Sequence, residues 1–259
     1  MYRISIISLL ICLTISAGQL IAPATSHADV SDKTLVMFIP NTDWPPYLIN
    51  DPQYPGGGVL LEVMRAVTEP LGYNVIPKKL PNKRGWLLLE SGEVNVHAKA
   101  KEWVTEPENY LWTEPFMQNE DVLLYLYGSN IEYTQPELLY GKTLVCIQDF
   151  IYPAFEKHFG PDKITRVDVA SPFAMLELLG RGRVDAAIVN KSETLWLFRN
   201  RPDLKPQRFR MDNNPCGSAG YRYVFTKDSR WLPFIEQFNK RLKEMKNNGQ
   251  LKAILDQYR

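Results

Sequence analysis

Short apolar segments with strand character alternate with helical segments along most of this sequence. Residues 34–40 form an apolar run that ends at a proline, and the stretch after Gly56-Gly57-Gly58 carries apolar residues at helical spacing until Gly72. A second strand, at residues 73–77, follows at once. The order strand, helix, strand predicts a parallel pair of strands joined by a right-handed crossover. A chain built from such units is restricted to an α/β fold.

Further segments repeat this pattern in two groups, which predicts two doubly wound lobes. The remaining segments expected are, in chain order, a helix at 84–91, a strand at 94–98, a strand at 143–148, a helix near 153–159, a strand at 164–169, a helix opened by Ser171 as N-cap and Pro172 at its first position, and a strand at 184–189.

Two further strands are predicted to cross between the lobes, at residues 121–127 and 221–226. Lobe 1 then comprises residues 29–120 and 227–259, and its last part holds two helices broken at Asn247-Asn248-Gly249. Lobe 2 comprises residues 128–220.

The first 28 residues are typical of a secretory signal peptide. Arg3 precedes a mostly apolar stretch at residues 6–15, and Ser26-His27-Ala28 is a small-residue cleavage site. The stretch is too short to span a bilayer, and Cys12 lacks the small preceding residue of a lipidated cysteine. We therefore expect a soluble mature protein that begins at Asp29 and is free in the periplasm.

Charge excludes some classes of partner. The sequence has 30 basic and 29 acidic residues, and cleavage after Ala28 removes only Arg3, which leaves the two charges balanced. No basic field exists to hold nucleic acid or an anionic membrane. We expect a monomer that binds a small polar solute.

The cysteines and histidines define no metal or cofactor site. Cys146 and Cys216 remain after processing, in a compartment that allows disulfides, and their spacing is compatible either with a disulfide or with two separate buried thiols. His97 and His158 have no partner at metal-ligand spacing. We therefore expect neither a metal nor a cofactor.

Several motifs carry a family pattern when they are taken in order. They are Gly56-Gly57-Gly58 with the helical segment after it, Arg84 followed by residues 89–94 (LESGEV), Trp112-Thr113-Glu114-Pro115-Phe116, residues 139–145 (LYGKTLV), residues 179–188 (LGRGRVDAAI) and residues 238–258. Together they resemble family 3 of the solute-binding proteins, the amino-acid-type receptors of ABC importers. The resemblance covers nearly the whole mature chain. It implies a Venus-flytrap fold, with two lobes, two crossing strands and a ligand held between the lobes.

The carboxyl ends of the predicted strands indicate a site at the same place. Ligands of open α/β sheets bind beyond these ends, where loop amides and helix N-termini converge. The loops there supply eight candidate ligand-binding residues: Trp44, Tyr47, Lys99, Lys101, Trp103, Phe150, Tyr152 and Asn190. The aromatic residues among them suit an apolar or cationic solute, although packing between the lobes is an equally good interpretation of any one of them.

The sequence departs from the family pattern at three ligand-holding positions. Glu106 stands where the family has an arginine for the ligand carboxylate, Asp149-Phe150-Ile151 replaces Gly-Thr-Thr, and Asn190 replaces the acid that holds the ligand ammonium. Glu106 and Asp149 would repel an α-carboxylate, so we expect a cationic or neutral solute. Lys99 or Lys101 could instead replace the arginine.

Three functions fit these features. The first is capture of a solute for an ABC permease, and the second is a receptor that reports its ligand to a sensor in the inner membrane. The third is an enzyme similar to the periplasmic cyclohexadienyl dehydratases, with Glu106, Asp149 or Glu193 as general acid. Because the sequence shows no Ser/His/Asp or Cys/His set, we expect a binding protein and no catalytic residues.

Overall fold

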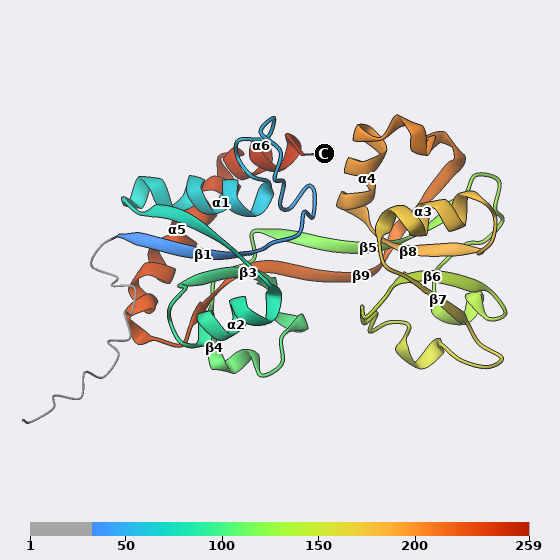
Figure 1. Cartoon of the computed structure of the whole chain (residues 1–259), viewed down its shortest axis with the longest axis horizontal. Helices are drawn as coiled ribbons and strands as arrows, with labels where there is room; N and C mark the ends of the chain where they lie inside the picture. Colours follow the sequence, from blue (N-terminus) through green and yellow to red (C-terminus); the bar gives the residue numbers. More distant parts are fainter. Residues whose placement is uncertain (1–32, 259) are drawn as a thin grey trace, which may run out of the picture.

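The computed structural model describes residues 33–258 and arranges them as two lobes (Figure 1). The predicted signal peptide lies outside the described residues. Two long strands, β5 (Met117–Leu126) and β9 (Phe209–Thr226), run through both lobes and connect them. No helix among the described residues is long and apolar enough to cross a bilayer.

Lobe 1 contains both ends of the described chain. Its elements are β1 (Thr34–Pro40), α1 (Val59–Thr68), β2 (Asn74–Leu80), α2 (Asn82–Glu90), β3 (Val96–Ala100), β4 (Tyr110–Trp112), α5 (Leu232–Asn247) and α6 (Gln250–Asp256). As predicted, β1 and β2, which precede and follow α1 in the sequence, pair in parallel. Gly72, with a φ of 81°, ends the helical region. The predicted break between the last two helices is also confirmed.

Lobe 2 repeats the same construction with different strands. Its elements are β6 (Thr143–Ile147), β7 (Thr165–Val169), α3 (Pro172–Gly180), β8 (Ala186–Asn190) and α4 (Lys191–Asn200). The predicted helix start is confirmed, because the Ser171 side chain accepts a hydrogen bond of 3.2 Å from the Ala174 amide and Pro172 is the first helical residue. The prediction of a helix near residues 153–159 is wrong. Only the short 3-10 turn Glu156–His158 forms there, and α4 was not predicted.

One continuous sheet joins the lobes, in the order β2-β1-β3-β9-β5-β8-β6-β7, with β4 on β9. The end of β3 at Ala100 lies opposite Tyr221 of β9, and the end of β8 at Asn190 lies opposite Asp121 of β5. Tyr221 is itself opposite Met117, only four residues before Asp121 on β5. The carboxyl ends of parallel strands in both lobes therefore converge on one short stretch of the crossing strands.

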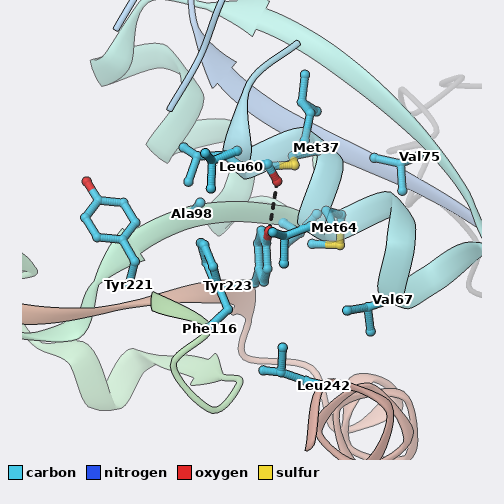
Figure 2. Packing of buried hydrophobic residues seen from close by; sticks show 14 of the residues in the cluster. Met37, Leu60, Met64, Val67, Val75, Ala98, Phe116, Tyr221, Tyr223 and Leu242 are labelled. Carbon is cyan, nitrogen blue, oxygen red and sulfur yellow. Dashed lines mark hydrogen bonds between the residues drawn. The ribbon is translucent and has the colours of Figure 1, made fainter. Parts of the chain in front are cut away.

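The larger core belongs to lobe 1 and packs α1, α5 and α6 on one face of its sheet. Figure 2 shows Tyr223 of β9 among Phe116, Met64 and Met37, with its hydroxyl donating a 2.8 Å hydrogen bond to the carbonyl of Leu60. This bond satisfies the phenol inside an apolar core and ties β9 to α1.

Of the two arrangements that the sequence allowed for Cys146 and Cys216, the structure has the second. Both are free, buried thiols in the lobe 2 core, and the candidate disulfide is not formed. The Cys216 thiol donates a 3.3 Å hydrogen bond to the carbonyl of Asp121. Burial raises the pKa of the Cys146 thiol to about 12, so it behaves as a small apolar side chain. Spacing in the sequence allowed both arrangements and could not supply the geometry that a disulfide requires.

Candidate functional site

The loop between β1 and α1, residues 41–58, carries two of the predicted aromatic residues toward lobe 2 (Figure 1). Trp44 and Leu48 exchange two backbone hydrogen bonds of 3.0 and 2.9 Å, which close a tight turn around Tyr47. The carbonyls of Pro46 and Tyr47 accept hydrogen bonds from the first amides of α1, those of Val59 and Leu60, at 3.0 and 3.1 Å. The loop is thus fixed to the start of α1, where unpaired helix amides need partners.

Tyr47 joins the two lobes through its hydroxyl. The ring is fully buried, and the hydroxyl oxygen lies 2.7 Å from Oδ1 of Asn119 on β5 and 2.9 Å from Oδ1 of Asn190. Asn190 also donates through Nδ2 to Asn119 and caps α4 by accepting a 3.0 Å bond from the Glu193 amide. The three side chains form one polar cluster between the lobes, in which Tyr47 and Asn119 are buried and Asn190 is partly exposed.

Aromatic rings surround this cluster on the lobe 1 side. Trp44 lies 4.2 Å from Tyr47 between ring centroids, and Tyr221 lies 5.9 Å from Tyr47 and 5.8 Å from Trp103. Tyr221 is only 1% exposed, yet no hydrogen bond joins its hydroxyl to any residue among 33–258. Figure 2 shows this hydroxyl turned away from Phe116 and Tyr223. Tyr221 therefore contributes its ring to the aromatic group at the junction.

Two carboxylates lie at the same place, Asp121 on β5 and Glu193 in the first turn of α4. Burial raises the pKa of Asp121 to about 6. Burial also raises the pKa of Glu193 to about 7. The negative charge of Asp121 raises this pKa further, whereas a hydrogen bond with the Trp44 side chain lowers it. Within residues 33–258 neither carboxylate forms a salt bridge. The junction therefore favours positive charge.

Of the three predicted residues here, Lys99 lies within β3, one residue before its end, whereas Lys101 and Trp103 follow the strand. The ammonium of Lys99 lies 5.7 Å from the ring centroid of Trp103, and partial burial lowers its pKa. Trp103 is 39% exposed and reaches the junction through Tyr221, whereas Lys101 is exposed. Lys99 thus adjoins the aromatic group, and Lys101 faces solvent.

The structure does not bring Glu106 and Asp149 together as an acidic pair beside Trp44. Glu106 lies in an exposed turn of lobe 1, accepts a 3.0 Å bond from Asn109, and shares a surface hollow with Thr226, at the end of β9 remote from the junction. Asp149 is exposed in the turn after β6. Both residues have a positive φ, 52° and 63°, typical of tight turns.

Phe150 and Tyr152 follow Asp149 but differ in environment. Phe150 is 56% exposed, whereas Tyr152 is buried and its hydroxyl accepts a 3.1 Å bond from the amide of Ile147. Tyr152 therefore serves the lobe 2 core.

Sequence reasoning missed Asp121, Asn119 and Tyr221 and assigned Glu193 only to the enzyme alternative. Asp121 and Tyr221 were the first residues of the two predicted crossing strands. A polar residue at the start of a strand that links two lobes was the available signal. Among the described residues no group of three or more His, Cys, Asp or Glu side chains is placed to hold a metal ion.

Two α/β lobes on one sheet, with two crossing strands and side chains converging at the strand ends, define a two-lobed periplasmic-binding-protein fold of the Venus-flytrap type. The family model of the bacterial extracellular solute-binding proteins, family 3, matches residues 36–259. The chain belongs to this family.

Solved structures support the fold. A histidine kinase sensor domain with similarity to periplasmic binding proteins is 22% identical, with a TM-score of 0.65, over 87% of this chain and 95% of that one. Substrate-binding domain 2 of GlnP from Lactococcus lactis, in an open conformation, is 15% identical with a TM-score of 0.67, over 87% and 95%. The VFT2 domain of BvgS from Bordetella pertussis is 16% identical with a TM-score of 0.66, over 89% and 95%. No curated protein matches the chain.

Proposed function

We propose that this protein captures a small polar solute between its lobes in the periplasm and presents it to an ABC permease. The observation that carries the proposal is the convergence of Trp44, Tyr47 and Tyr221 with two partly buried carboxylates at the crossing strands. Side chains of this kind, gathered from several elements, are typical of ligand sites in α/β proteins. Membership of a family of extracellular binding proteins supports the location and a binding role without catalysis.

The charge of the junction supports a cationic or neutral solute. The acidic groups of the proposed site are Asp121 and Glu193, and not Glu106 and Asp149 as expected from the sequence. An α-carboxylate buried beside these two groups would lack a matched partner, which costs several kcal/mol. An ammonium group would gain both the carboxylates and the aromatic faces of Trp44 and Tyr221.

This proposal predicts the outcome of a binding panel on the mature protein. Calorimetry should give roughly micromolar dissociation constants for one or more of putrescine, spermidine and choline, and none for the common amino acids. Asp121→Asn should weaken that binding by at least about tenfold, because it removes a charged partner. Glu106→Gln, which changes an exposed carboxylate outside the junction, is the matched control and should bind as the wild type does.

Binding of a common amino acid that is abolished by Lys99→Ala would overturn the cationic class. It would assign the ligand carboxylate to Lys99, the alternative that the sequence left open.

The signal peptide leads to a second prediction. Because Ser26-His27-Ala28 is a good processing site, periplasmic protein should begin at Asp29. N-terminal sequencing measures this directly. A membrane-bound product that retains Arg3 would show that the segment is an anchor instead.

A ligand-reporting receptor is the second candidate, favoured by the similarity of the fold to a kinase sensor domain. Permease and ATPase genes beside the coding gene would support import. A kinase or cyclase gene in that position would support sensing.

A further inference from the structure

We infer that the loop of residues 41–58 is a latch that contacts α4 at both ends and holds the lobes closed whether or not a solute is bound. The inference goes beyond solute capture, because it concerns the resting state of the protein. It depends on contacts between the protein's own side chains on opposite sides of the junction.

The first contact of the latch is at the start of α4. The Tyr47 hydroxyl lies 2.9 Å from Oδ1 of Asn190, the N-cap residue of the helix, and 2.7 Å from Oδ1 of Asn119 on the crossing strand. The Tyr47 ring and its contact with Asn119 are buried, and the contact with Asn190 is partly buried, so the low local dielectric strengthens this group of polar contacts. Separating the lobes would remove the contact between this buried phenol and Asn190 of lobe 2.

The second contact of the latch is at the other end of the same helix. The hydroxyl of Tyr54 donates a 3.2 Å hydrogen bond to Oδ1 of Asn200, the last residue of α4. The Tyr54 ring also packs against Trp196, with 6.3 Å between ring centroids. One lobe 1 loop thus contacts the first and last turns of a ten-residue helix of lobe 2, and Figure 1 shows the two elements facing each other.

Both halves of the latch are held firmly by their own lobes. The loop is bound to α1 through the carbonyls of Pro46 and Tyr47, and Tyr54 lies in a turn closed by a 2.9 Å bond from its amide to the carbonyl of Asp51. On the other side, Lys191 of α4 forms a 2.7 Å salt bridge with Glu120 of β5. Because neither part needs to be ordered by a ligand, little entropy opposes closure.

A closed resting state has a direct consequence for binding. Tyr47 occupies hydrogen-bonding positions of Asn190 and Asn119 that a solute between the lobes would otherwise use. The hydroxyl therefore acts as an internal competitor, and a solute must bind an open form that is a minority of the population.

The test compares tyrosine-to-phenylalanine variants of the mature protein without added solute. Tyr47→Phe/Tyr54→Phe keeps both rings and removes both hydroxyls, so its radius of gyration by small-angle scattering should exceed that of the wild type. Amide hydrogen exchange at Glu193, which Asn190 caps, should become about tenfold faster. Tyr110→Phe is the matched control, because it removes a 2.8 Å bond to Glu90 inside lobe 1 and should change neither quantity.

An unchanged radius and unchanged exchange in the double variant would overturn the latch. If the loss of the buried Tyr47 hydroxyl prevents folding, Tyr54→Phe alone, which changes a more exposed bond, gives the same test with a smaller shift. Since no solute is added, this result is independent of the binding panel. The latch can therefore be disproved while the proposed solute site is supported, and the solute site can be disproved while the latch is supported.

Discussion

Replacing Gly58 with alanine is expected to destabilise the protein by about 3 kcal/mol or more and to abolish solute binding. Gly58 has a φ of 96° and a ψ of 170°, a backbone conformation that is essentially restricted to glycine. An added Cβ would also lie 2.5 Å from the carbonyl oxygen of Tyr47 and 2.9 Å from Cα of Leu48. These are backbone atoms, so no side-chain rotation relieves the contact.

Urea unfolding measures the stability change, and Gly141→Ala is the matched control. Gly141 has a φ of 76°, and nothing lies within 4 Å of the position that a Cβ would occupy there, so this variant contains the strain without the collision. We expect it to lose about 1 kcal/mol. If both variants lose the same amount, Gly58 does not position the Tyr47 loop.

Acidification from pH 7 to pH 4 should remove about 3 kcal/mol of stability through His97 alone. His97 is buried in lobe 1, stacks on Phe38 with 4.3 Å between ring centroids, and has Nδ1 3.0 Å from the Phe38 carbonyl. Burial lowers the pKa of His97 to about 3. The hydrogen bond to the Phe38 carbonyl raises this pKa and so opposes the shift, whereas the positive charge of Lys99 lowers it further. Below about pH 6.5 the unfolded chain therefore takes up the proton first, and the free energy of unfolding falls until about pH 3.

The measurement compares urea unfolding of the wild type and His97→Phe between pH 7 and pH 4. Asp121 and Glu193 act in the opposite direction, because their raised pKa values make the folded protein bind protons more readily as the pH falls. Both carboxylates are present in both proteins and cancel in the difference. Parallel stability curves for the two proteins would contradict the assignment of a neutral, buried His97.

The fold was predictable because its strongest signals are local. The strand Thr34–Pro40 is continuous in apolar residues, and the start of α3 depends on two adjacent residues, Ser171 and Pro172. Helix α4 was not predicted because Thr194 is its only fully buried residue, so it lacks a clear apolar face and depends on the Asn190 cap. The stretch at 153–159 buries Phe155 and His158 three residues apart, which suits a 3-10 turn as well as a helix.

The candidate site was predictable only in part. The principle that ligands bind beyond the carboxyl ends of the strands identified Trp44, Tyr47 and Asn190, which the structure brings together. It did not find Asp121 and Tyr221, because these lie within long crossing strands and reach the junction through the register of the sheet. Glu106 and Asp149 were chosen by correspondence to family positions, and sequence order cannot show which way a turn directs a side chain.

The position of β9 in the sheet also sets the order in which the lobes can be completed as the chain is synthesised. The core of lobe 2 is built from residues 122–216, a single continuous segment. Lobe 1 needs the second half of β9 to fill the gap beside β3, and then Phe238 and Leu242 of α5 to cover that sheet. The lobe that is synthesised first is therefore the one that must finish folding last. Until β9 and α5 have been synthesised, β1 and β3 lack the elements that bury them in the folded protein.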